Sequence, residues 1–95
     1  MSGSLAVLDR LGREVKRFPL ASGVATIGRG AACDIRVMLP SVLDHHATIA
    51  IHDNQAILRS VESGGTRVNG RAVSVWRLRP GDRLDVGGRE LRWSG

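Results

Sequence analysis

The sequence has few of the features that mark secreted or membrane proteins. Its single cysteine, Cys33, cannot form a disulfide within the chain, which favours a reducing compartment, the cytosol or the nucleus. No apolar run approaches the ~20 residues of a membrane-spanning helix, and the first residues lack the basic start and apolar stretch of a signal peptide. The 95 residues are enough for one domain with a modest core. We therefore expect a single domain over residues 1–95, cut from a longer protein, with no membrane partner.

Aromatic residues are also scarce, and this affects whether the basic chain can be expected to bind nucleic acid. The formal net charge is +5, from 14 basic and nine acidic residues. This excess is compatible with nucleic-acid binding. However, the bases are spaced singly, and Phe18, Trp76 and Trp93 are too few to form a platform for stacking bases. A basic nucleic-acid-binding domain therefore stays an alternative and not the main prediction.

Alternating or short apolar segments predict strands along the whole chain, and no segment has the apolar stripe of an amphipathic helix. Turn-forming pairs separate them, among them Asp53-Asn54, Asn69-Gly70 and Gly87-Gly88. Turns at this spacing predict an all-β, antiparallel sandwich or barrel. The Thr48–Leu58 segment is the clearest hairpin, with Ile57 expected to return to the face of Ile49 and Ile51. The predicted core comprises Leu5, Val7, Ile27, Ile35, Val37, Ile49, Ile51, Ile57, Leu84, Val86 and Leu91.

Residues with catalytic or metal-binding potential form no convincing set. The histidines are His45, His46 and His52, and the lone cysteine is distant from them in sequence, whereas a zinc site needs three or four converging ligands. Gly28-Arg29-Gly30 lacks the third glycine of a dinucleotide fingerprint and the Lys-Ser/Thr pair of a P-loop. We predict that the protein is not an enzyme and that it uses no metal or cofactor.

Four motifs in order resemble the forkhead-associated (FHA) domain: Gly28-Arg29, Cys33-Asp34-Ile35, His46-Ala47-Thr48-Ile49 and Gly65-Thr66-Arg67-Val68-Asn69-Gly70. The resemblance covers nearly the entire chain and implies a sandwich of about 11 strands that binds phosphothreonine peptides through loops at one end. It is strongest to a nuclear, chromosome-associated member of the family. This implies a nuclear protein linked to the cell cycle, with the cytoplasm as the alternative location.

The resemblance also assigns roles to individual residues. The family's Gly-Arg pair falls on Gly28 and Arg29, whose guanidinium suits a phosphate oxyanion, and His46 matches a histidine that supports the loops without touching ligand. The residues that the resemblance and the loop positions suggest as peptide contacts are Arg29, Ser41, His45, Ser63, Thr66 and Arg67. Those with an expected structural role are Gly28, His46, Gly65, Asn69 and Gly70.

Three positions depart from the family pattern. Leu43 replaces a serine that donates to the phosphate, Asp44 replaces a polar or basic residue, and Gly64 replaces an asparagine that holds the peptide backbone. With Arg29 against Asp44 and Glu62, the expected ligand loops are net acidic, which disfavours a doubly charged phosphate. The sequence therefore predicts a protein-interaction module that binds phosphothreonine peptides through a weakened pocket. A phosphate-independent scaffold or dimerisation domain remains the alternative.

Overall fold

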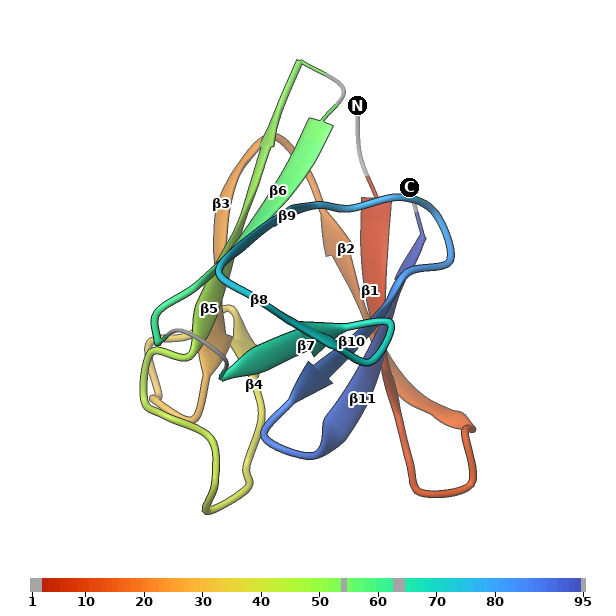
Figure 1. The fold of residues 1–95 in the computed structure, drawn as a ribbon, viewed down its shortest axis with the longest axis vertical. Coiled ribbons are helices and arrows are strands. Elements are labelled where there is room, and N and C mark those ends of the chain that lie inside the picture. The colour runs from red at the N-terminus through yellow and green to blue at the C-terminus, as the bar shows by residue number, and fades with distance from the viewer. Residues whose placement is uncertain (1–2, 54, 63–64, 95) are drawn as a thin grey trace.

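A computed structural model describes residues 3–53, 55–62 and 65–94, which form two packed β-sheets with no helix among them. The six-stranded sheet has the order β2-β1-β11-β10-β7-β8, and the five-stranded sheet has the order β4-β3-β5-β6-β9 (Figure 1). All pairings are antiparallel except that of β3 with β4. The strands are β1 (Gly3–Leu8), β2 (Glu14–Leu20), β3 (Gly23–Gly28), β4 (Ile35–Arg36), β5 (Ala47–His52), β6 (Gln55–Ser60), β7 (Thr66–Val68), β8 (Arg71–Val73), β9 (Val75–Arg77), β10 (Arg83–Val86) and β11 (Arg89–Ser94). The all-β prediction is confirmed.

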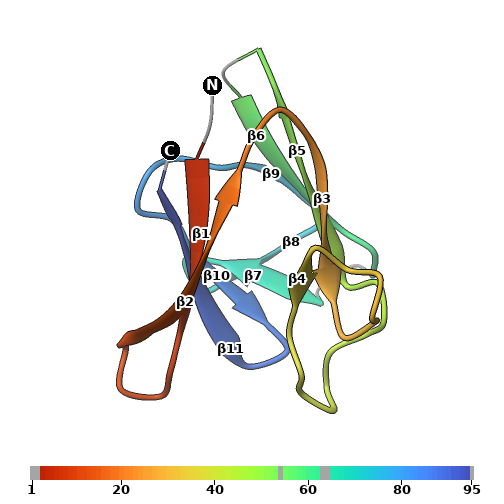
Figure 2. The same ribbon diagram turned by 180° about the vertical axis from the view of Figure 1, so that it is seen from behind.

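The core lies between the inner faces of the two sheets, which face each other across the molecule (Figure 2). Most of the expected core is buried, but Ile57 is not part of it. The register of the β5–β6 hairpin pairs Ile51 with Ala56 and Ile49 with Leu58, so these residues point inward. Because side chains alternate along a strand, Ile57 lies on the outer face. The prediction for Ile57 was therefore wrong by one residue. Val7, also predicted, is partly exposed but packs against the core.

Two turns show why the sequence reverses where it does. Asn69 and Gly70, between β7 and β8, both have positive φ, at 52° and 83°, as a tight hairpin turn requires. In the turn before β10, the Asp82 N–H donates to the Arg79 carbonyl at 3.0 Å, and Gly81 has a φ of 89°. Pro80 followed by glycine at positive φ is the pattern of a type II turn.

Asp82 joins this second turn to the rest of the sandwich. The buried carboxylate accepts hydrogen bonds from Asn69 Nδ2 at 3.0 Å, Trp76 Nε1 at 3.1 Å and the Arg79 N–H at 2.8 Å. Burial alone would raise the pKa of Asp82, but the hydrogen bonds from Arg79, Asn69 and Trp76 outweigh it, so the pKa is lowered. The ionised carboxylate therefore stabilises the fold by tying the β7–β8 turn to β9 and to the residues before β10.

Asp82→Asn is expected to lower the free energy of unfolding by about 1–2 kcal/mol at pH 7, because the amide NH₂ would face donors that now bond to a carboxylate. A lowered folded-state pKa gives stabilisation that is present above the ordinary aspartate pKa and lost as pH falls through the folded value. The difference in the free energy of unfolding between the wild type and the variant should therefore become smaller below about pH 4. Urea unfolding at pH 7 and pH 3 measures this, and an equal difference at both pH values would contradict it.

Candidate ligand-binding site

Backbone hydrogen bonds fasten two of the expected ligand loops together beside the ends of β3 and β5. The Arg29 N–H donates to the Leu43 carbonyl at 2.9 Å, and the Gly30 N–H donates to the Asp44 carbonyl at 3.1 Å. The first loop connects β3 to β4, and the second connects β4 to β5 (Figure 1). The position of Arg29 relative to Leu43 and Asp44 is therefore fixed by the backbone.

This close approach requires glycine at position 28. A Cβ added to Gly28 would collide with the Asp44 carbonyl, and one added to Gly30 would lie 3.0 Å from the same oxygen. Real Cβ atoms essentially never come closer than 3.0 Å to such an atom. A side chain at position 28 would consequently force the two loops apart, which explains glycine there by packing.

His46 connects the β4–β5 loop to the β6–β7 loop. The Leu43 N–H donates to His46 Nδ1 at 3.2 Å, so the other ring nitrogen carries the proton, and Nε2–H donates to the Gly65 carbonyl at 2.6 Å. The Gly65 N–H in turn donates to the Glu62 carbonyl at 3.0 Å. His46 is only 3% exposed, so its ring supports both loops from inside and does not face solvent.

His46→Ala is expected to destabilise the fold by about 2 kcal/mol, because it leaves the partly buried Leu43 N–H and Gly65 carbonyl without their partner and creates a cavity where the buried ring was. The measurement is urea unfolding, with His52→Ala as the control, since the His52 side chain is 85% exposed. If His46→Ala lost no more stability than the control variant, the supporting role of His46 would be contradicted.

Arg29 is the cation of this site. Its side chain is exposed and takes part in no ion pair or hydrogen bond among the residues that the structure describes. Its carbonyl accepts a hydrogen bond from Arg36 Nε at 3.1 Å. All five N–H donors of the Arg29 guanidinium are therefore available to a ligand.

One apolar and two acidic residues lie on the loops that are bonded, directly or through His46, to the Arg29 loop. Leu43 is 37% exposed, and Asp44 and Glu62 are exposed on the loops that His46 joins. Neither carboxylate forms an ion pair with Arg29 in the described part of the chain. The departures predicted at Leu43 and Asp44 thus lie beside the cation, whereas Gly64 and Ser63 fall outside the described residues.

The remaining predicted contacts are placed differently. Ser41 is exposed, and its hydroxyl donates to the Gly87 carbonyl at 2.5 Å. His45 is exposed in the β4–β5 loop. Thr66 is fully buried, with its Oγ1 accepting from Ser60 Oγ at 3.1 Å, so its hydroxyl faces the interior instead of a surface ligand. Arg67 is exposed on β7 opposite Ala72 and Asp85, within the six-stranded sheet and outside the loops.

Asn69 and Gly70 lie at the other end of β7. Asn69 Oδ1 accepts from the Arg83 N–H at 3.0 Å, and its amide donates to Asp82, so both polar groups of the side chain are used within the fold. Their contribution is to the β7–β8 turn.

One residue of the site was not predicted. Cys33 Sγ donates to the Asp44 carbonyl at 3.0 Å, which adds a third contact between the first two loops. Cys33 lies in a motif that the sequence analysis singled out, but a thiol carries no sequence signal for this contact.

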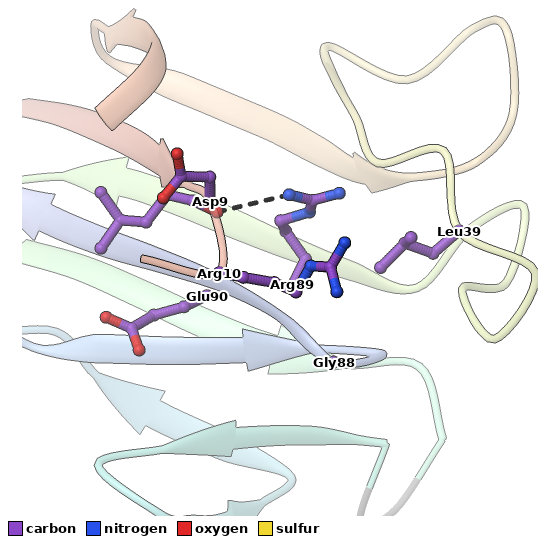
Figure 3. A pocket seen from close by; sticks show the side chains of 7 residues that line it. Asp9, Arg10, Leu39, Gly88, Arg89 and Glu90 are labelled. Atoms are coloured by element: carbon purple, nitrogen blue, oxygen red, sulfur yellow. Dashed lines mark hydrogen bonds between the residues drawn. The ribbon is translucent and has the colours of Figure 1, made fainter. Parts of the chain in front are cut away.

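A separate groove of about 760 Å³ lies between the β1–β2 turn, the β10–β11 turn and Leu39 (Figure 3). Arg89 crosses one side of it and donates from its guanidinium to the Leu8 carbonyl at 3.4 Å. Arg10, Asp9 and Glu90 also line it. None of the predicted ligand residues that the structure describes contributes to this groove.

The residues that the structure describes contain no group of three or more His, Cys, Asp or Glu side chains placed to hold a metal ion. They also contain no helix that is long and apolar enough to cross a membrane.

Comparison with known proteins identifies the family. The family model for the FHA domain matches residues 25–87. The chain is 37% identical over 91 residues to the human proliferation marker protein Ki-67 and 35% identical over 94 residues to the mouse protein. These matches cover 94% and 97% of this chain but only 3% of either relative.

Solved structures agree with the sequence matches. An FHA domain studied for phosphothreonine-dependent interactions superposes with a TM-score of 0.88 at 30% identity, covering 100% of this chain and 97% of its own. The FhaA FHA domain, solved in complex with an intracellular domain of another protein, gives a TM-score of 0.84 at 30% identity, covering 96% and 98%. The predicted resemblance is confirmed, and the chain belongs to the FHA family of protein-interaction domains.

Proposed function

We propose that this domain binds phosphothreonine peptides through the loops around Arg29. The observation that carries the proposal is an exposed guanidinium without a partner in the described chain, on a loop whose backbone is fixed by Leu43 and Asp44. A guanidinium held in this way matches a phosphate oxyanion with two parallel hydrogen bonds. The solved relative whose phosphothreonine-dependent interactions were studied supports the same ligand class.

We propose that this pocket binds phosphate more weakly than a pocket with the full set of family contacts. Leu43 offers no hydroxyl to the phosphate, and Asp44 and Glu62 place negative charge on the same loops. His45 and Ser63 can supply polar contacts to the peptide, as can Ser41 if its hydroxyl leaves Gly87. Thr66 is given a supporting role here, because its hydroxyl is buried. The functional partner is a protein, and the module performs no catalysis of its own.

A phosphate-independent docking function is the second candidate. The observation that favours it is the exposed Leu43 and Asp44 beside Arg29, since an apolar and acidic surface suits an unphosphorylated segment better than a phosphate. We also propose that the protein acts in the nucleus. This location rests on the similarity to Ki-67, of which the chain matches a small part.

A peptide library separates the two candidates. The domain is incubated with matched phosphothreonine and unphosphorylated peptides, and the bound peptides are mapped by backbone amide chemical shifts. The proposed function expects enrichment of phosphothreonine peptides and shifts at Arg29, His45 and residues 61–65. Enrichment of unphosphorylated peptides alone would establish the docking function instead.

A further inference from the structure

The outer face of the five-stranded sheet has an apolar and uncharged centre. Val24 on β3, Ala50 on β5 and Ile57 on β6 stand directly opposite one another in one cross-strand row. Thr26 and Thr48 form the next row on the same face. Val24 is 65% exposed, and Ala50 and Ile57 are partly exposed, so the row is open to solvent mainly at Val24. A sheet face that contacts only solvent normally carries polar side chains at these positions.

Arginines stand on both sides of this centre. Arg77 on β9 follows Ile57 in the first row, and Arg59 on β6 follows Thr48 in the second. Arg36 lies on β4 at the opposite edge and is exposed. None of the five strands contains an aspartate or glutamate. The charges carried by this sheet are therefore positive.

Two acids lie close to this face, and both already have partners. The Asp34 carboxylate accepts from the Thr26 N–H at 3.0 Å and from Thr26 Oγ1 at 3.2 Å. Asp53, in the β5–β6 turn, lies 3.1 Å from His52 Nε2. Neither pairs with Arg36, Arg59 or Arg77 in the described part of the chain. These arginines keep their hydrogen-bonding capacity for an external group, apart from the bond of Arg36 Nε to Arg29.

We propose that this outer face docks a protein segment with an apolar face flanked by acidic residues, independently of phosphorylation. The Val24, Ala50 and Ile57 row supplies apolar area, and the arginines beside it select acidic neighbours. A second copy of the chain fits poorly, because the same face would bring arginines and no acid to the contact. Nucleic acid also fits poorly, because its phosphates would meet the apolar centre.

Two synthetic amphipathic helical peptides test this surface. One has leucines on one face flanked by glutamates, and the other has lysine in place of every glutamate. The glutamate peptide should shift the amide resonances of Val24, Ala50 and Ile57 and leave the Arg29 loop unchanged. We expect it to bind about tenfold more tightly than the lysine peptide at low salt, because two or more exposed arginines contribute to the difference. The preference should decrease as salt is added.

Matched variants localise the effect. Val24→Glu places an acid in the apolar row and should weaken binding of the glutamate peptide at least about fivefold. Leu11→Glu in the β1–β2 turn, at a residue that is 74% exposed, should leave it unchanged. Arg77→Ala should weaken binding, whereas Arg71→Ala on β8 should not. Both pairs change exposed positions, and the dispersed amide spectrum of each variant reports its folding.

Three results with the peptides would overturn the proposal. They are equal binding of the two peptides, shifts confined to the Arg29 loop, and weakening by Leu11→Glu to the same extent as by Val24→Glu. A concentration-dependent dimer that Val24→Glu dissociates would also overturn it, because the occupant would then be a second copy. None of these results depends on phosphopeptide binding, so the proposed function is tested separately.

Discussion

Arg29→Ala is expected to lower phosphothreonine-peptide affinity about tenfold or more while leaving the melting curve nearly unchanged. A hydrogen bond to a charged phosphate contributes about 1.5–3 kcal/mol, and the exposed Arg29 side chain makes no ion pair or hydrogen bond in the described chain that its removal would break. Exposed substitutions of this kind change stability by less than about 0.5 kcal/mol. Isothermal titration and thermal unfolding of the same preparations measure the two quantities.

Arg71→Ala serves as the control for net charge. Arg71 is an exposed arginine on β8, so its loss changes the charge of the domain equally. It should leave affinity within about twofold, since long-range steering by one exposed charge is weak at physiological salt. Strong unfolding of Arg29→Ala would show that Arg29 is a structural residue, and equal losses in both variants would show that only net charge matters.

Replacing the three departing residues with family-like ones should strengthen phosphothreonine binding by more than about tenfold. The combined variant is Leu43→Ser, Asp44→Arg and Gly64→Asn. A serine hydroxyl bonded to a charged phosphate contributes about 1.5–3 kcal/mol, whereas an exposed charge change contributes about 1 kcal/mol or less. Leu43→Ser should therefore gain more than Asp44→Arg. Leu43 is 37% exposed and its N–H already bonds to His46, so serine fits there without disturbing that contact.

The single variants show which position limits the pocket. Each is titrated with the same phosphopeptide after its unfolding curve has been measured. Gly64→Asn replaces a glycine, and asparagine accepts positive φ better than most other residues do. Tight wild-type binding that falls on Leu43→Ser would mean that the pocket uses another geometry. No binding by any folded variant would favour phosphate-independent docking.

The sequence predicted the strands and turns because they depend on local signals. The alternation of apolar and polar residues along a strand is visible within a few residues of sequence. The same holds for turns, where residues such as Asn69 and Gly81 adopt positive φ. Ile57 was wrongly assigned to the core because the alternation of side chains divides a strand into two faces without indicating which face points inward. The β5–β6 register decides that, and it follows from the turn at Asp53.

The site was harder to predict because its contacts join distant segments. His46 and Gly65 are 19 positions apart, and their hydrogen bond depends on how two loops meet. The Thr66 hydroxyl was expected at the surface, yet a β-strand can turn the same polar group toward the core, where Ser60 satisfies it. The Asp82 network went unnoticed because a single acid in a Pro-Gly-Asp turn is ordinarily exposed.

The most direct test of the central claim is a titration of the domain with one peptide in two forms. The tightest phosphothreonine peptide from the library is compared with its unphosphorylated counterpart at physiological salt. If the phosphate accepts charged hydrogen bonds from Arg29, the phosphorylated form should bind at least about tenfold more tightly than the unphosphorylated form. This advantage should disappear in Arg29→Ala. Equal affinity for the two forms, or an advantage that persists in Arg29→Ala, would contradict phosphothreonine recognition by this site.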